Sequence, residues 1–286
     1  MIEVVGTGPH ASVQDLGRVG YAAWGIAGGG AADRGSLRLA NRLVGNAQTA
    51  AAFELLLAGA TLRFDRAAVI AVTGATCPFT VDGSAGRCDG PQLVPAGAVV
   101  RFGTPAQRLR TYVAVRGGVA TDPVLGSRAT DERSGLGRAL RPGDVVPVGI
   151  DVVGPPLVDV APVPGWPEGV ITLPGVLGPR DDWFTAESLD AFGHSDYTVA
   201  AASDRVGIRL DGPRLRRRDA AAELLSEPTI RGAIEVPPDG RPIIFSADHS
   251  TTCGYPVVAV LDPHGADLAA QCRPGQSVTF ALTRLT

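Results

Sequence analysis

The stretch that decides the fold is 242–261, PIIFSADHSTTCGYPVVAVL, in which two apolar runs enclose a polar loop. The first run is 242–245 and the second is 257–261. Short apolar runs bounded by Gly and Pro are typical of buried strands. The sequence therefore predicts two strands joined by a polar loop that a rigid β scaffold holds in place.

The loop 248–256 concentrates reactive side chains, with a carboxylate, an imidazole, three hydroxyls, a thiol and a phenol. They belong to Asp248, His249, Ser250, Thr251, Thr252, Cys253 and Tyr255. Loops held by rigid strands are where binding and catalytic groups concentrate. A turn whose Asp and Thr side chains cap their own backbone explains the same composition equally well at this stage.

The composition of the whole chain favours a β-rich fold. Its 286 residues include 37 Gly and 23 Pro, which punctuate short elements and turns. Many short strands are therefore expected rather than a helix bundle. The length allows one large or two medium domains. The net charge of -3 gives no electrostatic footprint for a nucleic acid partner.

The chain contains no lysine, so all 26 of its Lys-or-Arg positions are arginine. Schiff-base chemistry, a lysine general base and a Walker-type phosphate loop each need an ε-amino group, and all three are excluded. If the protein takes part in ATP chemistry, a partner must supply the nucleotide site. A biotin-acceptor Met-Lys pair is absent for the same reason, so any biotin would be on a separate carrier.

The cysteines and histidines lack the spacing of a metal site, and no metal is expected. They are Cys77, Cys88, Cys253, Cys272, His10, His194, His249 and His264. The N-terminal residues show neither the basic region nor the apolar run of a signal peptide, and no apolar run reaches membrane-spanning length. These features favour a cytoplasmic location with reduced thiols.

The polar segment 12–18 follows a short predicted strand and contains Gln14, Asp15 and Arg18. Asp15 and Arg18 either pair with each other in a tight turn or point together at a ligand. The glycine run 25–30 lacks the spacing of a dinucleotide site, so a close backbone approach or a flexible flap is expected there. Asp33 is a suitable N-cap for a helix over 34–44, and its carboxylate could equally face a site.

Apolar and alternating runs between 52 and 115 predict a series of strands. Arg116 follows the last of them, beside two glycines, and places a fixed cation at a strand end. The segment 125–141 is rich in Gly, Ser and Arg and is predicted to be a long loop that serves as a lid or a partner contact.

A proline-rich segment predicts a division into two lobes. Its prolines are Pro155, Pro156, Pro162, Pro164 and Pro167. The predicted domains are an N-terminal β lobe over 1–153 with a helix at 33–45, a linker over 154–168, and a C-terminal β lobe over 169–286. The second lobe repeats the first loosely. Short helices are expected near 183–192, capped by Asp182, and near 266–272.

Blocks of residues along the whole chain occur in the order found in a known family. The N-terminal blocks are Gln14-Asp15-Leu16-Gly17-Arg18, Gly20-Tyr21, Asp33, Arg38-Leu39-Ala40-Asn41 and Val44-Gly45-Asn46. The later blocks are 125–128, 203–210, 232–237 through 255–256, and 274–275. The sequence thereby resembles the biotin-dependent carboxyltransferase-like family, which includes allophanate hydrolase subunit 2, the C subunit of 5-oxoprolinase and a Kip-type inhibitor antagonist.

The resemblance implies a mainly β fold with a few short helices, built as two β-barrel-like lobes of cyclophilin-like character. It also implies a subunit of an ATP-dependent amide or lactam hydrolase, most directly a 5-oxoprolinase that converts 5-oxoproline to glutamate. The implied partners are a subunit-1-like, Kip-inhibitor-like protein and a third 5-oxoprolinase subunit. Two alternatives stay open: a urea or amide carboxyltransferase that uses biotin on a separate carrier, and a non-catalytic regulatory subunit that binds a kinase-inhibitor-like partner.

Four positions depart from the family pattern. Ser250 replaces a glutamine and Cys253 replaces a glycine in the polar loop, while Asp204 replaces an asparagine and Glu235 a glutamine. The lost amide both donates and accepts hydrogen bonds. A Cβ at position 253 restricts the turn. The polar character of the loop is nevertheless kept.

The candidate catalytic residues are Asp248 and His249, because amide chemistry needs a group that moves a proton at nitrogen. The substrate-binding candidates supply hydroxyls, an amide, carboxylates and guanidinium groups that suit a substrate carboxylate. They are Gln14, Asp15, Arg18, Asp33, Arg116, Arg205, Thr251, Thr252 and Tyr255. Alternatively, each arginine forms a structural pair with Asp15, Asp33 or Asp204. We expect the site in a cleft between the two lobes.

Overall fold

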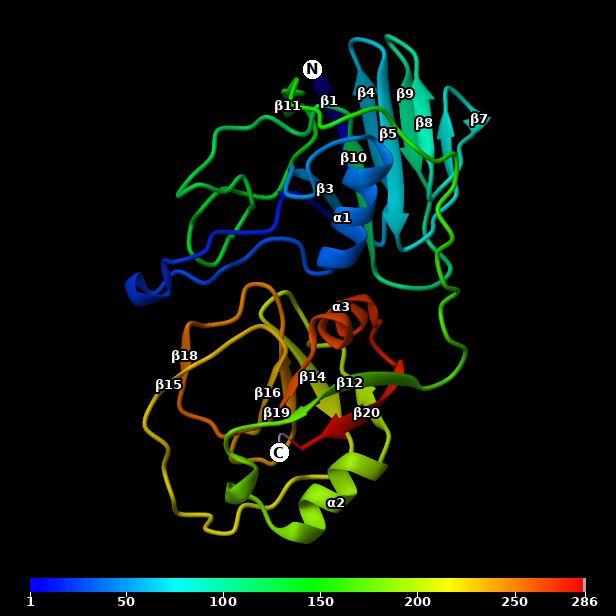
Figure 1. Cartoon of the computed structure of the whole chain (residues 1–286). Coiled ribbons are helices and arrows are strands. Elements are labelled where there is room, and N and C mark those ends of the chain that lie inside the picture. The colour runs from blue at the N-terminus through cyan, green and yellow to red at the C-terminus, as the bar shows by residue number, and fades with distance from the viewer. Residues whose placement is uncertain (285–286) are drawn as a thin grey trace. The chain divides into compact units, whose positions relative to one another are not determined.

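The structure is a computed structural model that describes residues 1–284, and the chain divides into two compact units (Figure 1). The first unit comprises Met1–Arg18 and Gly29–Trp166. The second comprises Val19–Gly28, with the 3-10 turn η1 (Ala22–Trp24), and the chain from Pro167 onward. The division after Trp166 falls inside the proline-rich segment. The limits predicted from the sequence, 1–153 and 169–286, stay a prediction.

Two antiparallel sheets form the first unit. The strands of one are β1 (Ile2–Thr7), β4 (Ala60–Phe64), β6 (Phe79–Val81), β7 (Ser84–Ala85), β9 (Val99–Phe102) and β11 (Val145–Val146). The strands of the other are β2 (His10–Gln14), β3 (Ala52–Leu56), β5 (Ala68–Gly74), β8 (Pro91–Val94) and β10 (Arg110–Val115). Their spatial orders are β11-β1-β4-β9-β6-β7 and β2-β3-β10-β5-β8. Apolar side chains from both sheets share one core.

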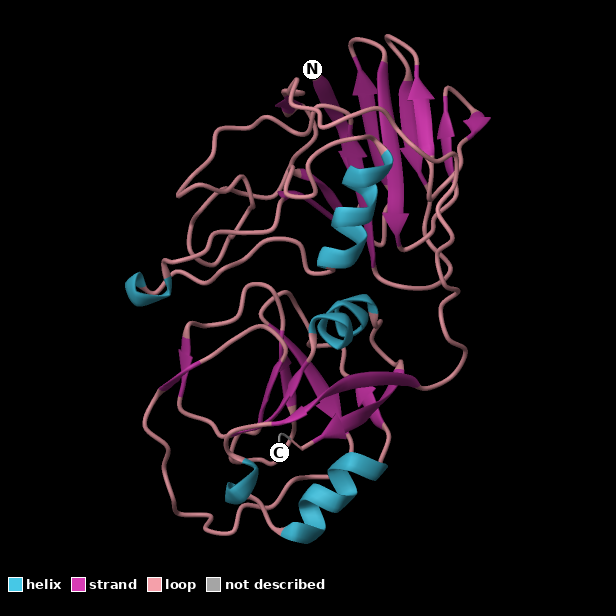
Figure 2. Ribbon diagram, in the orientation of Figure 1, coloured by secondary structure: helices cyan, strands magenta, loops and turns pink. Residues whose placement is uncertain are grey.

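One helix, α1 (Arg34–Leu43), packs against β5 and β10 of the five-stranded sheet (Figure 2). Leu37, Ala40 and Leu43 are buried and recur at helical spacing, so one face of the helix meets the sheet. The side chain of Asp33 accepts a hydrogen bond from the Ser36 amide, which makes Asp33 the N-cap that the sequence predicts.

The second unit is a closed seven-stranded barrel. Its strands are β12 (Ile171–Leu177), β13 (Tyr197–Val199), β14 (Gly207–Asp211), β16 (Ala233–Glu235), β17 (Ile243–Phe245), β19 (Val257–Leu261) and β20 (Ser277–Thr283). The barrel order is β12-β19-β16-β17-β14-β13-β20. The pair β12 and β20 is parallel, and it closes the barrel. Closure leaves no open edge in this sheet.

Two helices and two short strands lie outside the barrel strands. The helix α2 (Ala186–His194) contacts β20, and α3 (Pro263–Gln271) contacts β12. The strands β15 (Glu227–Pro228) and β18 (Thr252–Cys253) pair only with each other in a two-stranded sheet.

The predicted cap of α2 is wrong. Asp182 lies in the 3-10 turn η2 (Asp181–Trp183), and the side chain of Thr185 accepts the capping bond from the Ser188 amide. The reason is Phe184, which is fully buried and has extended backbone, so the turn ends there and the helix starts afresh.

The proline-rich segment packs on the first unit up to its end. Arg116 Nη1 donates to the Gly154 carbonyl, and the Ala161 amide donates to the Asp89 carbonyl. Arg108 Nη2 donates to the Pro164 carbonyl, and its guanidinium lies 5.1 Å from the centre of the Trp166 ring. The segment is therefore anchored by specific contacts as far as Trp166.

The fold class predicted from the sequence, mainly β with a few short helices, is confirmed. Residues 1–284 contain no helix that is long and apolar enough to cross a membrane. The cytoplasmic location stays a prediction.

Candidate functional site

The polar loop lies between two barrel strands, as its flanking sequence predicts. β17 and β19 are the two neighbours of β16 in the barrel, so the loop joins strands on either side of β16. Thr252 and Cys253 in the loop form β18 and pair with β15. The loop is thus held at both ends by the barrel and along its second half by a strand pair.

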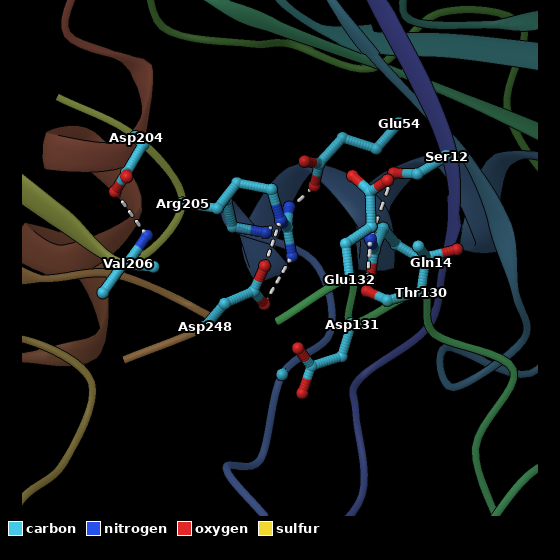
Figure 3. Close-up of polar contacts among 12 residues, drawn as sticks. Ser12, Gln14, Glu54, Thr130, Asp131, Glu132, Asp204, Arg205, Val206 and Asp248 are labelled. Carbon is cyan, nitrogen blue, oxygen red and sulfur yellow. Dashed lines mark hydrogen bonds and ion pairs between the residues drawn. The ribbon is translucent and has the colours of Figure 1, made fainter. Parts of the chain in front are cut away.

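Asp248 forms a two-point ion pair with Arg205 (Figure 3). Arg205 Nε donates to Oδ2 at 2.7 Å, and Nη2 donates to Oδ1 at 3.0 Å. The Asp248 amide also donates to the Arg205 carbonyl at 2.8 Å. The carboxylate is 8% exposed, so this charge-assisted pair is largely shielded from water. The geometry holds the carboxylate in one orientation.

His249 is buried beside Asp248, and its ring stacks on Phe245 with the centroids 5.7 Å apart. Its Nδ1 lies 2.7 Å from the Ser250 carbonyl oxygen and 3.3 Å from Thr229 Oγ1. A carbonyl oxygen only accepts, so Nδ1 carries the hydrogen in that contact. In the neutral ring, Nε2 is then the nitrogen that takes up a proton.

The remaining loop candidates lie nearer to solvent. Thr252 and Tyr255 are exposed, and Thr251 is half-buried. The Thr251 carbonyl accepts a hydrogen bond from the Thr229 amide at 3.0 Å. Thr251, Thr252 and Tyr255 therefore follow Asp248 and His249 in the chain but are more exposed to solvent than they are.

Two of the four departures from the family pattern touch each other. Cys253 Sγ donates to Glu235 Oε2 at 2.7 Å. Burial and the neighbouring carboxyl raise the pKa of the Cys253 thiol to about 11. Burial also raises the pKa of Glu235, against the opposing effects of Cys253 and Arg209. The thiol is therefore protonated at neutral pH and is a poor nucleophile.

Three first-unit candidates converge on the segment 127–130. Asp15 accepts hydrogen bonds from Ser127 Oγ at 2.6 Å and from the Arg128 amide at 2.7 Å. Gln14 Nε2 donates to the Thr130 carbonyl at 3.1 Å. Arg18 Nη2 donates to the Ala129 carbonyl at 2.6 Å. Asp15 and Arg18 therefore do not form the mutual pair that was one interpretation of their spacing, since each binds the segment separately.

Two atoms of these residues have no hydrogen-bond partner within the described part of the chain. They are Gln14 Oε1 and Arg18 Nη1, and both are buried. Gln14 Nε2 also donates to Ser12 Oγ at 3.0 Å, which orients the amide (Figure 3).

Asp33 and Arg116 mark opposite ends of α1. Asp33 caps its first turn, whereas Arg116 Nη1 donates to the carbonyl of Val44, the C-cap residue. A helix rises about 1.5 Å per residue, so about 15 Å separates the ends of this ten-residue helix. These two candidates therefore do not belong to one small site.

The alternative in which each arginine forms a structural pair with Asp15, Asp33 or Asp204 stays a prediction. Arg18 and Arg116 donate to carbonyl oxygens, and Arg205 pairs with Asp248. Asp204 Oδ1 instead accepts from the amides of Val206 and Gly207 and so orders its own turn.

Sequence reasoning misses a buried polar cluster in the first unit. Glu54 Oε2 accepts from the Tyr112 hydroxyl at 2.7 Å and from the Ala32 amide at 3.0 Å. Arg110 Nε lies 3.5 Å from Glu54 Oε1. Burial and the nearby carboxylates of Glu54 and Asp33 raise the pKa of Tyr112 well above its usual value. The signal in the sequence is a single Glu inside the apolar run 52–57.

Within residues 1–284, no three His, Cys, Asp or Glu side chains gather in a way that would hold a metal ion. All four cysteines are free thiols. Among the described groups, the His249 imidazole is of a type that can transfer a proton, and guanidinium groups are of a type that can stabilise negative charge.

The chain is mainly β with a closed barrel, and the polar loop 248–256 joins two of the barrel strands. Residues 24–282 match the family described as carboxyltransferase domain, subdomain A and B, and the chain belongs to this family.

Relatives of known name cover nearly the whole chain. The C subunit of 5-oxoprolinase from Escherichia coli is 34% identical over 98% of this chain and 90% of the relative. The urea amidolyase of Saccharomyces cerevisiae is 32% identical over 98% of this chain, which corresponds to 16% of that protein.

Solved structures also superpose on nearly the whole chain. The crystal structure of TTHA0988 superposes with a TM-score of 0.86 at 34% identity, and this chain spans 55% of its length. The Kluyveromyces lactis urea amidolyase superposes with a TM-score of 0.91 at 28% identity, and this chain spans 18% of its length. Both matches cover 98% of this chain.

Proposed function

We propose that this chain is a subunit of an ATP-dependent amide or lactam hydrolase of the 5-oxoprolinase type, which converts 5-oxoproline to glutamate. The observation that carries the proposal is its similarity to the C subunit of 5-oxoprolinase, which extends over 98% of this chain and 90% of the relative. The similarity spans both units, so it includes the polar loop and the segments that contain the first-unit candidates.

The roles follow from the contacts of the loop. His249 moves a proton at the lactam nitrogen through Nε2, because Nδ1 is occupied by the Ser250 carbonyl. Asp248 stands beside it, oriented by Arg205. Thr251, Thr252 and Tyr255 contribute hydroxyl groups that orient the substrate.

The first-unit candidates complete the proposed substrate-binding set. They are Gln14, Asp15, Arg18, Asp33 and Arg116. Among them, Gln14 and Arg18 each have a buried polar atom without a hydrogen-bond partner within residues 1–284, whereas Asp15 accepts from the Arg128 amide and Asp33 caps α1.

The nucleotide is proposed to bind to a partner, since a lysine-free chain cannot form a Walker-type phosphate loop. That partner is a subunit-1-like, Kip-inhibitor-like protein, joined by a third 5-oxoprolinase subunit. The Escherichia coli relative is named as one subunit of 5-oxoprolinase, which agrees with an assembly of several chains.

The test is reconstitution of the complex from this chain and the products of its neighbouring genes. ATP-dependent release of glutamate from 5-oxoproline is expected. Asp248→Asn and His249→Gln should each reduce kcat by about a hundredfold or more, while the complex still assembles in size-exclusion chromatography. A complex that assembles but never hydrolyses an amide or lactam would favour the regulatory alternative.

A matched control is Asp267→Asn. Asp267 forms a partly buried ion pair with Arg231 in the same unit, at 2.5 Å and outside the polar loop. The substitution removes a carboxylate from a comparable pair, so it reports the effect of an ion pair broken outside the polar loop. Equal losses of kcat in Asp248→Asn and Asp267→Asn would contradict a role for Asp248 in the chemistry.

A second candidate function is a urea or amide carboxyltransferase. The similarity to urea amidolyases, in sequence and with a TM-score of 0.91, favours it. In this case a separate carrier must bring the carboxylated biotin, and urea rather than 5-oxoproline would be consumed.

A further inference from the structure

A cavity of about 280 Å³ lies within the first unit, beneath the segment that joins β10 to β11. The residues that line it come from 13–18 and 121–146. The sequence predicts a lid or a partner contact for 125–141. In the structure this segment forms much of the wall of a small cavity, and its role as a lid or partner contact stays a prediction.

Arg18 is the distinctive group in this wall. Its side chain is 3% exposed, and both of its hydrogen bonds within residues 1–284 go to neutral carbonyl oxygens, those of Val124 and Ala129. Val124 and Ala129 also line the cavity. Arg18 Nη1 has no partner in the same part of the chain. A buried guanidinium is always charged, and it is unfavourable without an anionic partner.

The charges of the other lining residues do not neutralise Arg18. Asp144 is engaged by Arg138 in a two-point pair, at 2.7 and 2.8 Å. Arg128 and Asp122 are both exposed, and their opposite charges add up to zero. The cavity therefore keeps one buried positive charge.

The rest of the wall combines apolar side chains with the hydroxyl groups of Thr121, Ser127 and Thr130. The apolar side chains are those of Val13, Val124, Leu136, Leu140, Val145 and Val146. A partly apolar wall with one buried cation is complementary to a molecule with one negative group and a partly apolar body. The volume is at the small end for ligand pockets, which limits the body to a short chain or a single ring.

We propose that this cavity binds a small organic monocarboxylate, whose carboxylate pairs with the Arg18 guanidinium and whose body contacts the apolar side chains of the wall. The proposal uses only the geometry of the first unit, so it stands independently of the proposed hydrolase function. The ligand is either the substrate of that reaction or another small acid, and the two share the same recognition chemistry.

The test is calorimetric titration of the full chain, without partners or ATP, with three probes. The first is 5-oxoproline, which carries a carboxylate and a lactam. The second is cyclopentanecarboxylate, which carries the carboxylate alone, and the third is 2-pyrrolidinone, which carries the lactam alone. Both acids should bind and 2-pyrrolidinone should not. Tighter binding of 5-oxoproline than of cyclopentanecarboxylate identifies the substrate as the ligand, and equal binding identifies a general carboxylate site.

Two variants separate the cavity from the fold. Arg18→Gln should weaken the binding of both acids by about tenfold to a hundredfold, the range for a hydrogen-bonded charge. Leu136→Trp fills the cavity, leaves Arg18 in place and should abolish binding. It keeps the test decisive if Arg18→Gln does not fold. The control Arg63→Gln breaks an exposed pair with Glu3 and should leave binding unchanged.

The proposal is overturned if neither acid binds at millimolar concentration. It is also overturned if Arg18→Gln and Leu136→Trp, both folded by circular dichroism, bind as tightly as the parent chain. Because the titration contains neither ATP nor partner, a negative result leaves the turnover assay of the proposed hydrolase untouched.

Discussion

At the scale of single residues, the contact between Cys253 and Glu235 explains how the loop accommodates two unusual side chains. Cys253 adds a Cβ and a thiol to the turn, and Glu235 supplies the carboxyl oxygen that accepts from the thiol at 2.7 Å. The two departures therefore compensate each other. Cys253 also lies in β18, so the contact fastens the second half of the polar loop to barrel strand β16.

We expect Glu235→Gln to make the Cys253 thiol more reactive. Removal of the carboxyl eliminates two of the effects that raise the thiol pKa to about 11. The thiolate fraction at pH 8 therefore increases, and the rate of reaction with a disulfide reagent should rise by roughly three- to tenfold. The rate measured in Cys253→Ala serves as the blank for the other three thiols. An unchanged rate would show that burial alone governs the thiol.

The pH dependence of stability should reflect Glu235. Burial raises its pKa above 4.5, so the folded state favours the protonated form. The associated stability is fully present below pH 4.5 and is lost as the pH rises through the folded-state pKa. Urea unfolding should therefore show that Glu235→Gln gains stability relative to the parent chain as the pH is raised from about 4.5 to about 7.

Glu227 provides a control of opposite sign. Arg180 lowers the pKa of Glu227, so the associated stability is present above pH 4.5 and is lost as the pH falls. Glu227→Gln should lose stability relative to the parent chain as the pH is raised to about 4.5 from below, and it should change little above that pH. If the stability of both variants relative to the parent chain changes in the same direction with pH, these two carboxyls do not govern the pH dependence of stability.

At the scale of elements, local patterns identify most of the structure near the decisive stretch. The two apolar runs correspond to β17 and β19, and the predicted helix over 34–44 corresponds to α1. Their signals are local: a run of apolar residues, a cap, and helical spacing. The cap of α2 is mispredicted because the buried Phe184 has extended backbone, which separates the turn at Asp182 from the helix that Thr185 caps. Burial of Phe184 depends on the tertiary structure, which local sequence does not show.

Long-range pairings cannot be predicted in the same way. The parallel pair of β12 and β20 joins strands that lie far apart in the chain, Ile171–Leu177 and Ser277–Thr283, and closes the barrel. The strands β15 and β18 have two residues each, too few for any periodicity. Arg205 pairs with Asp248 and not with the adjacent Asp204. This choice of partner likewise depends on the long-range pairing of β14 with β17.

Gly30, the last residue of the glycine run 25–30, makes a close backbone approach, one of the two interpretations of that sequence. Gly30 has a φ of +85°, and the Ala31 amide donates to the Asp15 carbonyl at 2.8 Å. A Cβ at Gly30 would lie 2.5 Å from the Gly17 nitrogen. The segment that contains Asp15 and Arg18 is thus positioned by the absence of a side chain at Gly30.

Gly30→Ala should therefore cost well over about 2 kcal/mol of unfolding free energy, because strain at positive φ adds to a steric clash with the backbone. Gly25→Ala is the matched control. Gly25 has a φ of +78°, but no atom lies within 4 Å of the position that a methyl group would take there. Only the conformational cost of about 1–2 kcal/mol then applies. Equal losses in urea unfolding would contradict the close approach.

At the scale of the whole molecule, the sequence locates the candidate groups better than it locates their partners. Asp248, His249 and Arg205 do come together in the second unit. In the first unit, Gln14, Asp15 and Arg18 gather on the segment 127–130, whereas Asp33 and Arg116 lie at opposite ends of α1. Motif spacing identifies residues of suitable chemistry, but the fold determines which of them lie close together.

The absence of lysine from the whole chain separates the two proposed functions experimentally. This chain cannot carry biotin, because biotin is attached to a lysine amine, and the carboxyltransferase therefore depends on a biotinylated carrier. The 5-oxoprolinase reaction, as proposed, uses ATP on a partner and no biotin. A reagent that sequesters biotin should therefore affect one reaction and spare the other.

Addition of excess avidin to the reconstituted complex should leave the release of glutamate from 5-oxoproline within about twofold of the untreated rate, since no step passes through a biotin that avidin would sequester. The urea carboxylation of a biotinylated urea amidolyase, assayed in parallel, is the positive control and should be lost. Loss of 5-oxoproline turnover with avidin, restored by prior saturation of the avidin with free biotin, would contradict the lead proposal and assign this chain to the carboxyltransferase reaction.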